Sequence, residues 1–205
     1  MSGGNNYEQI YRDIVYKLAD CDLHEAAKRL GLPPPFGGVI KMMFLGREYE
    51  ISSAGIKPAD GLPVNPNYLS TLVYYVTSKG KPEPEYSYSL LHSFISGPIG
   101  GGFDISWMTA PLARKFGNDY AGFGGAMESL GAISEKSPKI NEHIWSYLIL
   151  PKIPAQIIYV EADDEFPCEI NVKLDNGAKR IMEFEQLAFL CGCFTGALEK
   201  YNKIM

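Results

Sequence analysis

The sequence predicts an α+β fold, in which a single domain has a largely antiparallel sheet with helices packed on it. Three runs of strand type follow one another at 144–150, 155–161 and 169–175, and only two turn segments separate them. Segments with helical periodicity lie mostly elsewhere in the chain. Strands that are grouped together in this way indicate an α+β domain. We therefore expect the three runs to be consecutive antiparallel strands of one sheet.

The stretch 157–175 has the clearest strand pattern in the chain. Residues 157–160 are β-branched or aromatic, as in a centrally buried strand. Residues 170–175 alternate between apolar and polar, which is typical of a strand with one wet face. The turn between these strands holds four carboxylates, those of Glu161, Asp163, Asp164 and Glu165. This acidic turn is the most unusual chemistry in the sequence.

The other elements follow from periodicity and from the residues at their ends. Apolar residues at three- and four-residue spacing predict helices over 7–18, 22–30, 65–79, 104–116, 119–130 and 184–202. Further strands are expected at 39–45, 48–52 and 86–90. We expect a loop rich in Gly and Pro between residues 53 and 64. A hairpin turn is expected at 175–177, where Asn and Gly tolerate positive φ.

Length and composition are those of one globular unit. A chain of 205 residues is most simply a single domain, and its hydrophobic content of 46% excludes a mostly disordered chain. We expect residues 1–6 to be a flexible N-terminal lead and residues 7–205 to form the α+β domain. The sequence has no apolar stretch long enough to cross a bilayer and no signal segment at its N-terminus. The expected compartment is the cytoplasm, with no membrane partner.

Charge and cysteine content argue against a nucleic-acid-binding protein and against a disulfide-stabilised one. The net charge is −5, with 24 acidic and 19 basic residues, and no basic run exceeds two residues. A nucleic-acid partner is therefore not expected, because phosphate binding needs clustered Lys and Arg. The four cysteines do not form a spaced disulfide framework and should be thiols. Cys191 and Cys193 are expected to pack as small buried hydrophobes.

Motifs that would identify an enzyme are not found. The sequence has no nucleophile elbow, no paired-histidine metal motif and no Walker sequence. The glycine-rich run 97–103 lacks both the Gly-Lys-Ser/Thr ending and the dinucleotide-binding spacing, so a loop or turn is the better interpretation. His92 and His143 adjoin strand segments and could face a common cavity, although a structural role is commoner for such residues.

Several short runs along the chain, taken together and in order, are specific to one family. They are FLGREY at 44–49, PLARKFG at 111–117, LPKIP at 150–154, DDEFP at 163–167 and VKLD at 172–175. These runs resemble the domain-of-unknown-function family three-seven-eight-six, and the likeness covers nearly the whole chain from about residue 7. The sequence departs from the family's pattern at Cys168, where a second Pro is usual, and in the looser segment 97–102.

The family has no assigned activity, so the resemblance implies a setting and not a reaction. Its members occur mainly in anaerobic bacteria and archaea, and some are joined to a cysteine-rich iron–sulfur domain of the kind used with corrinoid proteins. This sequence lacks that domain, because four scattered cysteines cannot supply its ligand run. The resemblance therefore implies an anaerobic setting near metal or tetrapyrrole chemistry.

Small-ligand or cofactor binding is the leading functional hypothesis. Gly122, Gly124 and Gly125 weaken the helix 119–130, which then needs a neighbouring backbone or a ligand packed against it. We expect a pocket between this helix and the sheet for a flat cofactor, with a tetrapyrrole or corrinoid as the first candidate. The competing account is tight packing by a neighbouring element. The expected ligand-binding residues are Tyr86, Tyr88, Phe123, Gly124, Trp145, Tyr147 and Tyr159.

Two alternatives from other classes remain open. One is a carboxylate- or metal-dependent enzyme that uses the acidic loop 161–165, with a divalent cation bound by Asp163, Asp164 and Glu165. The competing account of that loop is a solvated turn whose carboxylates accept backbone hydrogen bonds. The other alternative is a non-catalytic interaction module, which would expose a large apolar patch.

Overall fold

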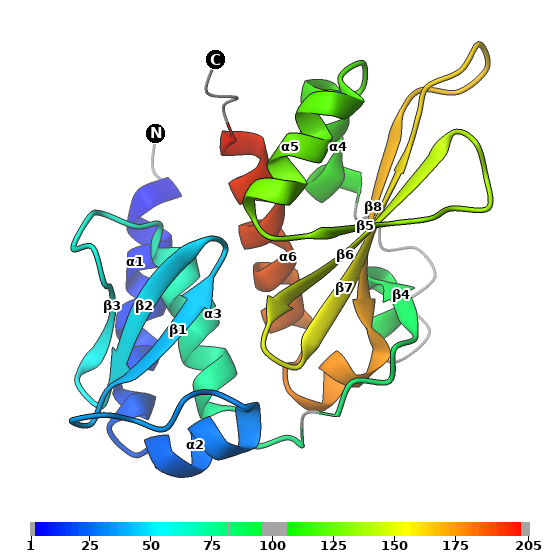
Figure 1. Cartoon of the computed structure of the whole chain (residues 1–205). Coiled ribbons are helices and arrows are strands. Elements are labelled where there is room, and N and C mark those ends of the chain that lie inside the picture. Colours follow the sequence, from blue (N-terminus) through cyan, green and yellow to red (C-terminus); the bar gives the residue numbers. More distant parts are fainter. Residues whose placement is uncertain (1–2, 82, 96–105, 202–205) are drawn as a thin grey trace.

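The N-terminal half of the chain forms a helical layer against a small antiparallel sheet (Figure 1). The computed structural model describes residues 3–81, 83–95 and 106–201. The sheet has the order β1-β2-β3, and both of its strand pairs are antiparallel. The elements of this half are α1 (Gly3–Ile14), η1 (Val15–Leu18), α2 (Leu23–Leu30), β1 (Ile40–Phe44), β2 (Arg47–Ser52), β3 (Gly55–Pro58) and α3 (Pro66–Thr77).

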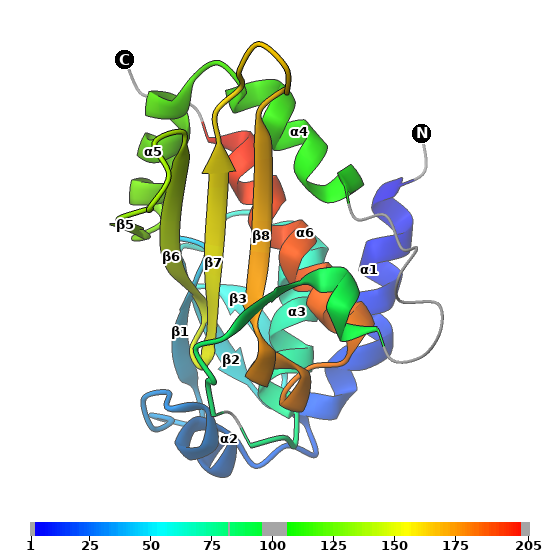
Figure 2. The ribbon, with the colours of Figure 1, turned by 90° about the vertical axis from the view of Figure 1, so that its right-hand side faces the viewer.

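The C-terminal half contains a five-stranded antiparallel sheet with the order β4-β8-β7-β6-β5. Helices α4, α5 and α6 lie on one side of this sheet (Figure 1), and Figure 2 shows α4 and α6 behind β7 and β8. The elements of this half are β4 (Tyr88–Leu90), η2 (Leu91–Phe94), α4 (Ser106–Phe116), α5 (Tyr120–Ser129), β5 (Ile133–Glu135), β6 (Glu142–Leu150), β7 (Ile153–Val160), β8 (Glu169–Asp175), η4 (Asn176–Arg180) and α6 (Phe184–Lys200).

The prediction of three consecutive antiparallel strands is confirmed. β6 pairs with β7 and β7 pairs with β8, so that Ile157 lies opposite Trp145 on one side and Val172 on the other. These three side chains are buried, whereas the next residues along β8, Asn171 and Lys173, are partly exposed. Because successive side chains on a strand point to opposite faces, the alternation read from the sequence corresponds to one buried and one wetter face.

Helices α2 and α3 begin at side-chain caps. The Asp22 carboxylate accepts hydrogen bonds from the backbone N–H groups of His24 at 2.9 Å and Glu25 at 3.1 Å, so α2 starts after it. Asn65 caps α3 in the same way, through the N–H of Asn67 at 3.0 Å. Helix α1 begins at Gly3, inside the segment expected to be a flexible lead. None of the described helices is long and apolar enough to cross a membrane.

Two local expectations are wrong. The expected loop 53–64 contains β3, which pairs with β2 and buries Ile56. The expected hairpin turn at 175–177 is the start of η4, because the Asp175 side chain accepts a hydrogen bond from the N–H of Gly177 and caps that helix. The edge strand β5 was also not expected. Strands of three or four residues are too short for alternation to distinguish them from a loop.

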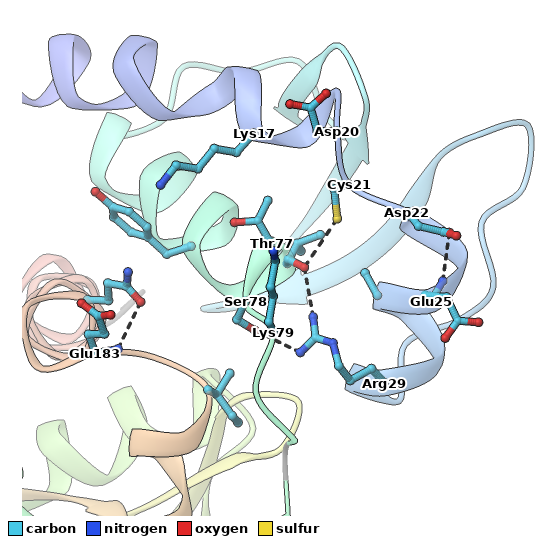
Figure 3. A pocket seen from close by; sticks show the side chains of 15 residues that line it. Lys17, Asp20, Cys21, Asp22, Glu25, Arg29, Thr77, Ser78, Lys79 and Glu183 are labelled. Carbon is cyan, nitrogen blue, oxygen red and sulfur yellow. Dashed lines mark hydrogen bonds between the residues drawn. The ribbon is translucent and has the colours of Figure 1, made fainter.

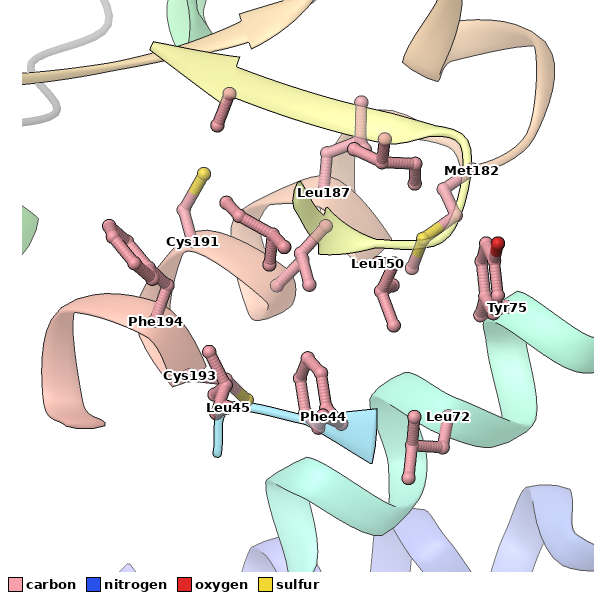
Figure 4. Packing of buried hydrophobic residues seen from close by; sticks show 14 of the residues in the cluster. Phe44, Leu45, Leu72, Tyr75, Leu150, Met182, Leu187, Cys191, Cys193 and Phe194 are labelled. Carbon is pink, nitrogen blue, oxygen red and sulfur yellow. The ribbon is translucent and has the colours of Figure 1, made fainter. Parts of the chain in front are cut away.

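One continuous core joins the two halves, which agrees with the single-domain expectation. In the view of Figure 4, Phe44 of β1 lies between Leu72 of α3 and Cys193 of α6, and all three belong to this core. Cys191 and Cys193 are buried, as predicted, and burial raises the pKa of each thiol to about 12. Both thiols are therefore neutral at physiological pH and act as small apolar groups in the core between the two halves.

Candidate functional site

The aromatic residues expected to line a pocket do not surround a common opening. Phe123, Trp145 and Tyr159 are buried, and the Phe123 and Tyr159 rings are in contact, with centroids 5.0 Å apart. Tyr147 stacks instead on Phe194 of α6, at a centroid distance of 5.5 Å and an interplanar angle of 24°. These rings fill the space between the sheet and its helices.

The two remaining tyrosines lie at the other edge of the sheet. Tyr88 is on β4, and β8 and β7 separate this strand from β6. Tyr86, which precedes β4, is 74% exposed. The seven residues expected to bind a ligand are thus divided between a packed interior and a distant edge. The glycine-rich run 97–103 lies outside the described residues.

Each glycine of α5 has a side chain packed within 4 Å of the position that its missing Cβ would take. A Cβ on Gly122 would lie 2.1 Å from the Asp119 carboxylate, which caps the helix through the Gly122 N–H at 2.8 Å. The corresponding distances are 3.5 Å from Gly124 to the Trp145 ring and 3.2 Å from Gly125 to the Tyr201 hydroxyl. The alternative of tight packing therefore accounts for the glycines in this helix.

A pair of substitutions at Gly124 tests the packing account. A Cβ at this position makes an ordinary contact with Trp145, so we expect Gly124→Ala to change the free energy of unfolding by no more than about 1 kcal/mol. Gly124→Leu would push against the buried ring and should destabilise the protein by about 1–3 kcal/mol. Urea denaturation of both variants measures the difference. Equal stability of the two variants would contradict tight packing here.

Hydrogen bonds from backbone N–H groups to one of its own side chains fix the shape of the acidic loop. The Asp163 carboxylate accepts hydrogen bonds from the N–H groups of Glu165 at 2.9 Å and Phe166 at 2.8 Å, and the loop is exposed. Among the residues that the structure describes, no three His, Cys, Asp or Glu side chains are placed to hold a metal ion. This arrangement matches the expected alternative of a solvated, hydrogen-bonded turn. Cation binding by Asp163, Asp164 and Glu165 stays a prediction.

The two histidines considered together in the sequence have different surroundings. His143 stacks on Tyr120, with centroids 3.7 Å apart, and its Nε2 lies 2.6 Å from a carboxylate oxygen of Glu161. His92 is in η2, beside the opposite edge of the sheet. The two side chains therefore do not share a cavity.

A polar cleft lies between the N-terminal half and the start of α6, and sequence reasoning did not predict it (Figure 3). Its volume is about 740 Å³. Side chains reach it from η1, from the turn before α2, from α2 itself, from the end of α3 and from the first turn of α6. Because these segments are far apart in the sequence and carry no motif, no spacing in the chain could have identified the cleft.

Arg29 holds one wall of the cleft in place. Its guanidinium donates hydrogen bonds to the Ser78 hydroxyl at 3.0 Å and to the carbonyl oxygens of Gly80 at 3.1 Å and Val76 at 3.2 Å. These acceptors are at the C-terminal end of α3 and in the chain that leaves it, where carbonyl groups have no partner within the helix. Arg29 therefore satisfies the helix end and fixes the segment after it.

Cys21 lies in the same wall. Its Sγ is 3.8 Å from the Val76 carbonyl oxygen, to which the thiol donates. Burial raises the pKa of the Cys21 thiol, and the nearby Arg29 charge partly offsets this rise. Cys21 is therefore a neutral thiol at pH 7. It is partly exposed, and so it can report chemically on whether the cleft is occupied.

Other charged groups of the cleft have no charged partner within the described part of the chain. Lys17, Asp20 and Lys79 line it and form no ion pair with any described residue. The Lys17 ammonium lies 5.9 Å from the centre of the Tyr74 ring, which is a cation–π contact. The cleft thus presents charges of both signs to solvent.

The lining also contains apolar side chains. Val76 is fully buried and Ile181 is 6% exposed, whereas Tyr74 is half-buried. Burial raises the pKa of Tyr74, so its hydroxyl is neutral at physiological pH. Val76 and Ile181 therefore present almost no side-chain surface to the cleft, whose lining is mainly polar and charged.

Fold and cleft together define a single α+β domain with a polar, open cleft at the junction of its halves. The chain belongs to the family described as "Domain of unknown function (DUF3786)", whose model matches residues 22–197. That match includes both sheets and most of the cleft. Neither the curated proteins nor the solved structures include a match to this chain.

Proposed function

We propose that this protein binds a small polar ligand in the cleft between α2, the end of α3 and the start of α6. The observation that supports the proposal is a cleft of about 740 Å³ lined by charged groups that form no ion pair within the described part of the chain. Small-molecule sites in proteins have volumes of roughly 300–1,000 Å³. Charged groups left facing such a space are available to a ligand without first breaking an internal ion pair.

The ligand class follows from the character of the rim. Its lysine and carboxylate groups favour a polar ligand over the flat, apolar tetrapyrrole or corrinoid that the family resemblance implies. Binding is favoured over catalysis, because the neutral Cys21 thiol is a poor nucleophile. We place this function in the cytoplasm, where four free thiols would stay reduced, and in the anaerobic setting implied by the family.

The test uses the reactivity of Cys21 in a Cys168→Ser background, because Cys191 and Cys193 are buried. The protein is incubated anaerobically with a small-molecule extract of an anaerobic bacterium, and alkylation by iodoacetamide is followed by mass spectrometry. Ligand binding should slow the alkylation of Cys21, and native mass spectrometry should show the added mass. The absorption spectrum of the same sample would reveal a tetrapyrrole or corrinoid.

A bulky side chain in the cleft supplies the matched comparison. Thr77 lines the cleft, so Thr77→Trp should abolish both the protection and the added mass. Glu128→Trp adds the same side chain on the exposed face of α5, away from the cleft, and should leave binding unchanged. Added mass that persists in Thr77→Trp would place the ligand elsewhere and contradict the proposal.

A further inference from the structure

We infer that the ligand of this cleft is a zwitterion, with an anionic group at one end and an ammonium group at the other. The inference rests on the proposed function and specifies the ligand class for the same site. The first step concerns which charges are already engaged within the protein. The Arg29 guanidinium donates to three acceptors, and the Asp22 carboxylate caps α2. The Arg29 donors are engaged in building the wall, whereas the Asp22 carboxylate, like any capping carboxylate, keeps lone pairs for a further donor.

The second step concerns the charges that remain, which are of both signs. Lys17 and Lys79 supply two ammonium groups, whereas Asp20, Glu25 and Glu183 supply carboxylates. Glu183 begins α6 in a capping box with Gln186, and a carboxylate in that position keeps lone pairs for a further donor. A simple anion would gain from the lysines but would face the carboxylates. A simple cation would gain from the carboxylates but would face the lysines.

The third step is the placement of opposite charges on different elements of the lining. Lys17 extends from η1 and Glu183 lies at the start of α6, apart from each other in the view of Figure 3. They form no ion pair with each other, so the gap exceeds the 4 Å of a direct contact. A molecule with a carboxylate toward Lys17 and an ammonium toward Glu183 would bridge the gap and satisfy both walls.

The fourth step concerns the lining between the two charges. Tyr74 lies next to the Lys17 ammonium, and Val76 and Ile181 are also in the lining. Since Val76 and Ile181 are buried, the accessible apolar surface among these three is the half-buried Tyr74 ring, which suits a short methylene chain better than a third charged group. An amino acid whose charges are separated by several methylene groups combines these features.

Three probes of equal chain length separate the ligand classes. They are 5-aminopentanoate, which carries both charges, pentanoate, which carries only the carboxylate, and pentylamine, which carries only the ammonium. Each is titrated against the Cys168→Ser protein, and the Kd is taken from the slowing of Cys21 alkylation. We expect 5-aminopentanoate to bind roughly threefold or more tightly than either other probe, because a second exposed ion pair adds an effect of that order.

Charge-removing substitutions assign the two ends. Lys17→Gln should abolish the advantage of 5-aminopentanoate over pentylamine, and Glu183→Gln, which keeps an acceptor for the helix cap, should abolish its advantage over pentanoate. Arg12→Gln is the control, since it removes an exposed charge that pairs with Glu8 on α1 outside the cleft. This control should leave all three affinities unchanged.

The outcomes distinguish this inference from the function on which it rests. If pentanoate or pentylamine binds as tightly as 5-aminopentanoate, the zwitterion is excluded and the cleft remains a binding site for singly charged molecules. If none of the three probes protects Cys21 while the anaerobic extract does, the inference is again overturned and the proposed function stands. If the anaerobic extract also fails to protect Cys21, both the inference and the proposed function are overturned.

Discussion

We expect Asp175→Ala to lower the free energy of unfolding by about 2–5 kcal/mol, because it leaves one buried and one partly buried backbone N–H without an acceptor. Asp175 is fully buried. Its carboxylate accepts the Gly177 N–H at 2.8 Å and the Glu85 N–H at 2.9 Å and 3.1 Å, one distance to each oxygen. The residue thereby joins the end of β8, the start of η4 and the chain that leads into β4.

A second aspartate with the same hydrogen-bonding role serves as the matched control. The Asp163 carboxylate also accepts two backbone N–H groups, but in an exposed loop where water can replace it. Asp163→Ala should therefore cost no more than about 1 kcal/mol. Urea denaturation of both variants gives the comparison. If the two losses of stability are equal, burial does not determine the strength of the Asp175 contacts.

The elements that were predicted correctly have signals that are local in the sequence. The strands within 144–175 alternate or form apolar runs, and the turns between them are marked by Pro and by acidic residues. The Asp22 and Asn65 caps are one residue from the helices they start. Asp175 shows where local reasoning fails, because Asn176–Gly177 is typical of a hairpin turn and only the buried carboxylate converts it into η4.

The cleft could not have been predicted in this way. Lys17, Arg29, Thr77 and Glu183 are brought together by packing of η1, α2, α3 and α6, and their spacing in the chain follows no rule. The glycine-rich helix shows the opposite error. Its glycines predict space for a ligand beside the helix. The side chains that lie there instead include Tyr201, which is distant in the sequence. Missing side chains indicate a close approach without indicating what approaches.

The segment that joins the two halves supplies the second large effect. Gly80 follows α3 in this segment, and its carbonyl oxygen accepts a hydrogen bond from Arg29 at 3.1 Å. Farther along, the Glu83 carbonyl oxygen accepts one from Arg180 at 2.6 Å. A Cβ on Gly80 would lie 1.3 Å from the Arg180 carbonyl oxygen. Since that atom belongs to the backbone, no rotation of a side chain can relieve the overlap.

We therefore expect Gly80→Ala to destabilise the protein by about 3 kcal/mol or more, because one of the two backbone segments must move. The same displacement would withdraw an acceptor from Arg29 and should speed the alkylation of Cys21 in the adjoining wall. Gly192→Ala is the matched control, since nothing lies within 4 Å of a Cβ at this helical position. It should stabilise the protein by up to about 1 kcal/mol through helix propensity. A Gly80→Ala variant as stable as Gly192→Ala, with unchanged Cys21 reactivity, would show that the joining segment does not hold the cleft in place.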